Sequence, residues 1–172
     1  MDEIEIVLYD PSWPTLFAAE ATRLRAVLAP NLILGLEHFG STAIPGLAAK
    51  PIIDILIAVP SLAAARETAI APLEDLGYLH WYDNPKTDRM FFVKGLPPHG
   101  ARRTHHVHMT EPSGEMWQRL AFRDYLRTHP DEAVRYERLK RELAAKHRDD
   151  REAYTGAKEA YVAAVMAKVE RG

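Results

Sequence analysis

The segment 51–59 constrains the fold more than any other part of the sequence, because apolar residues fill both its odd and its even positions. They are Ile52, Ile53, Ile55, Leu56, Ile57 and Val59. A strand with water on one face alternates apolar and polar residues, whereas a strand covered on both faces is apolar nearly throughout. The segment therefore predicts a central β-strand with other elements on both sides. A chain of 172 residues can bury such a sheet within one domain.

Patterns elsewhere predict the neighbours of this strand. Further strands are expected at 4–9, 32–39, 78–82, 90–94 and 105–110, the third and fourth of them forming a hairpin. Helices are expected from Ser12 to about Leu28 and over 61–76, where Gly77 would end the second. After Pro112 the pattern is helical, with one helix over 114–127, another opened by Pro130 and a third beyond residue 150.

This order of elements predicts an α+β fold, a mixed β-sheet flanked by helices and followed by a C-terminal group of helices. We expect a single domain over 1–172, in which 1–111 form the mixed sheet with its helices and 112–172 form the helical part. The C-terminal helices are expected to buttress the sheet. In the second of them, Val134, Leu139 and Leu143 would face inward and the charged residues of 132–152 would face water.

Charge and composition exclude several classes of protein. The chain has 22 Lys and Arg against 24 Asp and Glu, a net charge of −2, so a generally basic nucleic-acid binder is not expected and any anion site must be local. No apolar run is long enough to span a bilayer, and the acidic N-terminus does not resemble a secretory signal, so a cytoplasmic location is expected. The absence of Cys excludes disulfides, thiolate metal sites and cysteine nucleophiles.

Asp54 is the most informative polar residue, because it interrupts the apolar strand. Burying an ionised carboxylate costs several kcal/mol unless a cation or several hydrogen bonds compensate it. One interpretation is a structural salt bridge. The other is a divalent metal beside a phosphate-binding turn of small residues, Gly40, Ser41 and Thr42, with Lys50 adding positive charge.

A second candidate lies in the predicted strand at 105–110. Alternation places His106 and His108 on one face, about 7 Å apart along the strand. Such a pair can bind a metal or an anion, or transfer protons near neutral pH. The alternative is a pair of half-buried histidines that serve only packing and hydrogen bonding.

Positive charge is concentrated between residues 86 and 108, which contain five basic residues and one acidic residue. This contrast with the whole chain favours a small polyanionic ligand or a phosphate. Arg89 and Lys94, near the ends of a predicted strand, are the better phosphate-binding candidates, whereas Lys86 and Arg102 are expected to be solvated. Tyr154 and Lys158, four residues apart, are expected to serve packing and the surface.

With these residues identified, the string HFGSTAIPGLAAKPIIDI at 38–55 closely resembles the signature of GrpB family proteins. The opening YDPSW at 9–13, the HVH at 106–108, the FRDYLR at 122–127 and Tyr154 with Lys158 resemble the family as well. The resemblance implies a nucleotidyltransferase-like fold. It also implies a relation to the GrpB-type domain that is fused to some bacterial dephospho-CoA kinases.

The superfamily pattern joins an apolar residue, Gly and Gly or Ser to a later Asp, an apolar residue and a second acid. Gly40, Ser41 and Asp54 fit it, but Leu56 stands where the second acid would be. The resemblance therefore implies a nucleotidyltransferase with a degenerate carboxylate site, because two-metal nucleotidyl transfer needs neighbouring carboxylates.

We expect a domain that binds a nucleotide or another phosphorylated small molecule. If it is an enzyme, Asp54, His106 and His108 would be catalytic and would hold Mg²⁺ or Mn²⁺, while Arg89 would bind a phosphate oxygen. A non-catalytic interaction or folding-assistance module related to dephospho-CoA kinase is the alternative. A histidine-based metal phosphohydrolase is a third possibility. Neither a membrane nor a nucleic acid is an expected partner.

Overall fold

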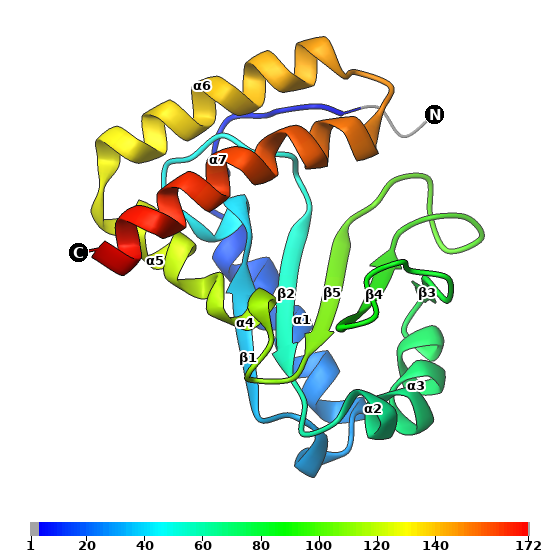
Figure 1. Cartoon of the computed structure of the whole chain (residues 1–172). Coiled ribbons are helices and arrows are strands. Elements are labelled where there is room, and N and C mark those ends of the chain that lie inside the picture. The colour runs from blue at the N-terminus through cyan, green and yellow to red at the C-terminus, as the bar shows by residue number, and fades with distance from the viewer. Residues whose placement is uncertain (1–3, 172) are drawn as a thin grey trace.

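The computed structural model describes residues 4–171, and its centre is a five-stranded mixed sheet (Figure 1). The strands are β1 (Gly35–Phe39), β2 (Ile53–Ala58), β3 (Tyr78–His80), β4 (Arg89–Lys94) and β5 (His105–Thr110), in the order β1-β2-β5-β4-β3. The β2–β5 pair is parallel and the other pairs are antiparallel. The α+β prediction is confirmed, and the apolar segment 51–59 supplies a strand with a neighbour on each side.

One face of the sheet is covered by α1 (Trp13–Val27), α2 (Leu62–Thr68) and α3 (Ile70–Asp75). Ile55 and Ile57 of β2 are fully buried there against the same cluster as Leu24 and Leu73. The helix predicted over 61–76 is divided at Ala69. Pro72 explains the division, because it has no N–H to donate to the carbonyl four residues earlier.

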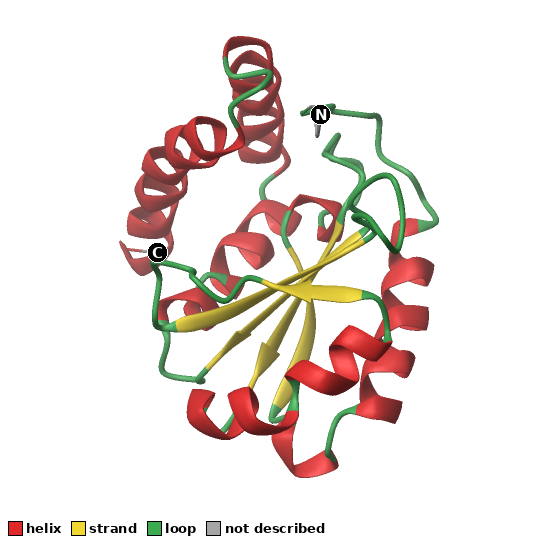
Figure 2. Ribbon diagram, turned by 90° about the vertical axis from the view of Figure 1, so that its right-hand side faces the viewer, coloured by secondary structure: helices red, strands yellow, loops and turns green. Residues whose placement is uncertain are grey.

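The other helices, α4 (Glu115–Gln118), α5 (Leu120–Thr128), α6 (Pro130–Lys146) and α7 (Arg151–Arg171), lie on the other side of the sheet from α1 to α3, and the helices that lead to the C-terminus stand off from the strands (Figure 2). The helix predicted over 114–127 is divided at Arg119. The C-terminal helices pack largely on one another and on the loop after β1, through Leu126, Tyr136, Ile44 and Leu47. These helices therefore pack less on the sheet than the sequence predicted.

The predicted inner face of α6 was wrong for Val134, whereas Leu139 and Leu143 are partly buried and Leu143 packs beside Ala144. Val134 is 55% exposed, whereas the buried residues follow a four-residue repeat. They are Glu132, Tyr136, Lys140 and Ala144. Two of the charged residues expected in water are therefore buried, and each has a specific partner that compensates its burial, as described below.

The strand predicted at 4–9 was also wrong. This segment is extended but makes a single β-bridge, in which Val7 and Ala49 exchange backbone hydrogen bonds of 2.9 and 3.0 Å. Further along the chain, Leu32 belongs to a short 3-10 turn, so the strand predicted from residue 32 begins at Gly35. Within residues 4–171, no helix is both long and apolar enough to cross a bilayer.

Candidate metal centre

The parallel register of β2 and β5 brings the predicted polar residues together. Asp54 is paired with His106, and the next residue of β2 on the same face, Leu56, is paired with His108. Because side chains alternate along a strand, Asp54, His106 and His108 lie on the face opposite the core of α1 to α3. His105 lies on the core side, where its Nδ1 is 2.9 Å from the Thr104 hydroxyl.

Three potential ligand atoms converge at this point. Asp54 Oδ1 lies 3.1 Å from His106 Nδ1 and 3.3 Å from His108 Nε2. All three atoms lie within 4.8 Å of one another. The Asp54 side chain is 25% exposed, and the two imidazoles are 10% and 14% exposed. Asp54 is thus paired with histidines rather than with an arginine, and the group can be reached from solvent.

The protonation of the group follows from its contacts. Burial alone would raise the pKa of Asp54, but hydrogen bonds from both imidazoles outweigh it and hold this pKa below its ordinary value. Burial lowers the pKa of His106 to about 4, despite its hydrogen bond with Asp54. An ionised carboxylate only accepts and Arg103, 3.5 Å from His106 Nε2, only donates, so His106 carries its proton on Nδ1.

Aromatic rings hold the two imidazoles in place. The Phe91 ring of β4 lies 5.0 Å from the His106 ring and 4.9 Å from the His108 ring, measured between centroids. Phe39, at the end of β1, lies 6.0 Å from His108. These contacts restrict ring rotation, so the imidazole nitrogens stay directed at Asp54.

The glycine turn lies directly against Asp54. Gly40 has a φ of 70°, and a Cβ atom at this position would lie 2.6 Å from Asp54 Oδ2. Both the backbone conformation and the space therefore require glycine. Ser41 follows in the turn and is partly exposed. Thr42 points elsewhere, since its buried hydroxyl is 2.9 Å from His38 Nε2, so it lies outside the centre.

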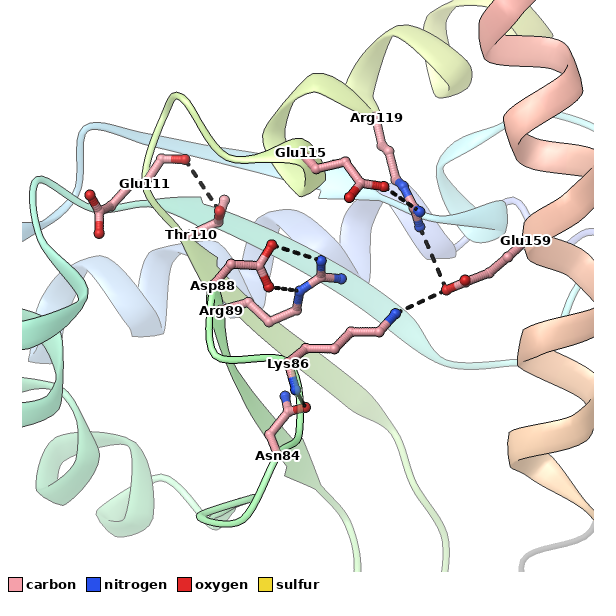
Figure 3. A network of polar contacts seen from close by, with 9 residues as sticks. All are labelled: Asn84, Lys86, Asp88, Arg89, Thr110, Glu111, Glu115, Arg119 and Glu159. Carbon is pink, nitrogen blue, oxygen red and sulfur yellow. Dashed lines mark hydrogen bonds and ion pairs between the residues drawn. The ribbon is translucent and has the colours of Figure 1, made fainter.

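The two phosphate ligands predicted on β4, Arg89 and Lys94, do not lie together. They are an odd number of residues apart, so their side chains project from opposite faces of the sheet. Lys94 lies on the core side, where Nζ is 2.8 Å from Glu20 Oε1, and it does not belong to this centre. Arg89 shares the face of His108 but lies toward the other end of β5, beside Thr110, and donates two hydrogen bonds to Asp88 (Figure 3).

Lys50 lies near the centre on the segment before β2. Its Nζ is 4.9 Å from the centroid of the buried Tyr154 ring of α7. Burial, together with the positive charges of Lys158, Arg151 and Arg103, lowers the pKa of Lys50 to about 7, although Asp54 opposes the shift.

Sequence reasoning gave no ligand role to three basic residues near the centre or near Lys50: Arg103 beside His106, Lys140 beside the carbonyl of Ala48, and Lys158 beside the Tyr154 ring. A usable signal for Lys140 was its four-residue spacing from Tyr136 and Ala144, which places it on a buried stripe. Arg103 was visible only as part of a basic segment, because its approach to His106 depends on the loop before β5.

Comparison with known proteins agrees with this architecture. The sequence matches the GrpB protein family over residues 3–168. It is 52% identical over 168 residues to the UPF0157 protein PA4798 of Pseudomonas aeruginosa, covering 97% of this chain and 68% of that protein. The fold matches the crystal structure of the conserved protein GrpB from Enterococcus faecalis with a TM-score of 0.83 and 34% identity, covering 96% of each chain.

A more distant similarity joins the chain to a larger protein. It is 32% identical to a dephospho-CoA kinase of Mycolicibacterium paratuberculosis, and the match covers 91% of this chain but 43% of the kinase. Sequence and fold agree over nearly the full length, and the chain belongs to the GrpB family.

Proposed function

We propose that this domain binds a divalent metal through Asp54, His106 and His108, and binds a nucleotide or another phosphorylated small molecule beside it. The convergence of one carboxylate oxygen and two imidazole nitrogens carries the proposal. An ionised Asp and a neutral His106 are both in the form that a metal requires. Three protein ligands leave further coordination positions for water or a ligand oxygen.

The ligand atoms suit some metals better than others. Ligand bonds of about 2.0–2.2 Å place neighbouring donor atoms about 3 Å apart, which agrees with the separations around Asp54 Oδ1. Two imidazoles and one carboxylate favour Mn²⁺, Zn²⁺ or Fe²⁺, whereas Mg²⁺ prefers oxygen ligands. Mn²⁺ is therefore the better of the two expected ions. When bound, such an ion polarises a phosphoryl oxygen or a water molecule.

The protein's own groups then have separate roles. If His106 Nδ1 binds the ion, its proton moves to Nε2, which no longer accepts from Arg103, so this guanidinium can turn toward a phosphate. Lys50 adds a second positive charge near Asp54 and Arg103. Two-metal nucleotidyl transfer is disfavoured, because Leu56 is fully buried where a second carboxylate would lie.

Calorimetric titration with Mn²⁺ and Zn²⁺ tests the metal centre. We expect Asp54→Asn, His106→Gln and His108→Gln each to weaken binding by at least about tenfold, since each removes a ligand. His105→Gln is the matched control, because His105 is on the same strand but faces the core, and it should bind as the wild type does. A wild-type protein that binds neither ion would contradict the proposal.

A second candidate is a non-catalytic module that associates with dephospho-CoA kinase. The similarity to 43% of a protein that carries the name dephospho-CoA kinase favours it. Co-expression of the two proteins followed by affinity capture tests this candidate. Capture of the kinase, with Asp54→Asn as effective as the wild type, would support an association that does not use the metal centre. Absence of capture at micromolar concentrations would reject it.

A further inference from the structure

Three lysines gather where α6 and α7 meet the segment before β2. Lys50 and Lys158 place their ammonium groups 4.9 and 4.6 Å from the centroid of the Tyr154 ring. Lys140 is 1% exposed and donates a hydrogen bond to the carbonyl of Ala48. We call Lys50, Lys140 and Lys158 the lysine cluster.

Among residues 4–171, carboxylates act on the lysine cluster only from beyond ion-pair distance: Asp54 on Lys50 and Glu137 on Lys140. Within residues 4–171, no carboxylate forms an ion pair with any of its three ammonium groups. The positive charge of Lys158 contributes to lowering the pKa values of both Lys50 and Lys140, after burial, which is the larger cause. Buried charge without a partner is costly, and an anion placed among these groups would remove most of that cost.

Tyr154 provides an independent observation. Its side chain is fully buried, and its hydroxyl has no hydrogen-bond partner among the described residues. Buried hydroxyls are nearly always hydrogen-bonded, so an orphaned one indicates a missing partner. The orphaned hydroxyl belongs to the same ring against which Lys50 and Lys158 lie.

Solvent reaches the lysine cluster at Lys50. Lys50 lines a cleft of about 810 Å³ that Arg103 and Arg151 also line, together with apolar residues such as Ile52 and Leu96. This volume is typical of sites for small organic ligands. The same Arg103 lies 3.5 Å from His106, so the cleft adjoins the metal centre.

We propose that Lys50 and Lys158, backed by Lys140, form an anion-binding site on the Tyr154 ring that takes a phosphoryl group. The inference rests on the proposed function, because the phosphoryl group belongs to the ligand of the metal centre. It assigns that group to α7 and the segment before β2 rather than to the Gly40 turn. The ligand class is thus a phosphate ester or diphosphate small enough for the cleft.

Calorimetry with inorganic phosphate and pyrophosphate at pH 7, without metal, tests the site directly. Lys50→Gln and Lys158→Gln should each raise the Kd at least about tenfold, since each removes a charge that contacts the anion. Lys158→Arg keeps the charge and should stay within about threefold of the wild type. Lys146→Gln, which removes an exposed charge from α6, is the matched control and should change nothing.

Lysine labelling gives a second readout that does not depend on folding of a variant. Phosphate should slow modification of Lys50 and Lys158 by an amine reagent in the wild type, as mapped by mass spectrometry, and should leave Lys146 unaffected. Equal Kd values for Lys158→Gln and Lys146→Gln, or labelling of Lys50 that phosphate does not slow, would overturn the site.

The Asp54→Asn variant separates the two proposals. It should lose Mn²⁺ binding and retain phosphate binding, because the lysine cluster is unchanged. Loss of phosphate binding in Asp54→Asn would contradict the lysine cluster as an independent anion site. Failure of the wild type to bind Mn²⁺, with phosphate binding intact and sensitive to Lys158→Gln, would defeat the metal centre alone.

Discussion

Lys140 combines two roles at the scale of a single residue. Its ammonium group donates to the carbonyl of Ala48, while Glu137, one turn earlier on α6, accepts from the N–H of Ala48 at 2.8 Å. The two side chains together satisfy both backbone groups of Ala48, which fixes α6 on the segment before β2. Lys140 does this at 1% exposure and with its Nζ 5.0 Å from the Tyr136 ring.

Burial should make Lys140 a measurable source of pH dependence. Burial and the charges of Lys158 and Arg141 lower its pKa to about 7, against the opposing effect of Glu137. Above pH 7 the unfolded chain still binds a proton that the folded chain has released, so stability should rise between pH 7 and 10. Lys140→Met should remove roughly 3 kcal/mol of that rise, measured by urea unfolding at both pH values.

Lys146→Met is the control for this prediction, because Lys146 is an exposed lysine of the same helix. It should follow the wild type at both pH values. A stability difference between Lys140→Met and wild type that is the same at pH 7 and pH 10 would show that Lys140 is charged to the same extent in both folding states.

The sequence was most informative about residues whose environment depends on strand alternation. Asp54, His106 and His108 were predicted from a single acid in an apolar strand and a two-residue histidine spacing, and the register of β2 and β5 brings them together. Lys94 was predicted as a phosphate ligand together with Arg89, but the two lie on opposite faces of β4, which their odd spacing already indicated. Lys50 was predicted to add positive charge to a phosphate site, but its approach to Lys140 and Lys158 was not predicted, because no strand register relates the three residues.

At the scale of elements, Glu20 links α1 to the edge of the sheet. Its fully buried carboxylate accepts from Lys94 of β4 and from the Tyr78 hydroxyl of β3, both at 2.8 Å. Burial alone would raise the pKa of Glu20, but the hydrogen bonds from Lys94, Tyr78 and Arg23 lower it overall. Three elements are therefore joined by one ionised group beneath the sheet.

Glu20→Gln should lower the free energy of unfolding by about 2–3 kcal/mol, because it leaves Lys94 without its partner in a largely buried position. Urea unfolding measures the loss. Mn²⁺ affinity should be unchanged, since Glu20 lies on the opposite face from the metal centre. Glu67→Gln, on the exposed side of α2, is the control. A loss below 0.5 kcal/mol would show that Glu20 does not stabilise the contact of α1 with β3 and β4.

Element boundaries were predicted less well than element types. The division of the helix at Ala69 follows from Pro72 and was readable in advance, whereas the division at Arg119 has no comparable sequence signal. The burial of Glu132 and Lys140 on α6 was not predicted, because both residues count as polar in any periodicity, while tertiary partners make their burial acceptable.

At the scale of the whole molecule, α7 is held by several hydrogen bonds and ion pairs to other elements but buries few of its own residues. Only Tyr154 and Val165 are buried among its described residues. Glu132 of α6 accepts from Tyr161 Oη at 2.6 Å and from Lys168 Nζ at 2.7 Å. Near the sheet, Glu159 joins Lys86 to Arg119 (Figure 3), but these pairs are largely exposed and contribute little each.

Glu132→Gln should therefore loosen α7 without unfolding the sheet. Hydrogen exchange followed by mass spectrometry should show amides of α7 exchanging at least about tenfold faster, because two charge-assisted bonds to a buried carboxylate are weakened. Amides of β2 and β5 should exchange as in the wild type, and so should all amides in Glu152→Gln. Equal acceleration in β2 and α7 would mean that both belong to one cooperative unit.

The parallel pairing of β2 with β5 also governs which mutations the family can tolerate. A slip of one position between these strands would present His105 and Val107 to Asp54 in place of His106 and His108. The connection from residue 59 to 104 can gain or lose loop residues without harm as long as that alignment survives. An insertion inside β5 itself would separate His106 and His108 from Asp54 and would also move the fully buried Val107 and Met109 out of the core.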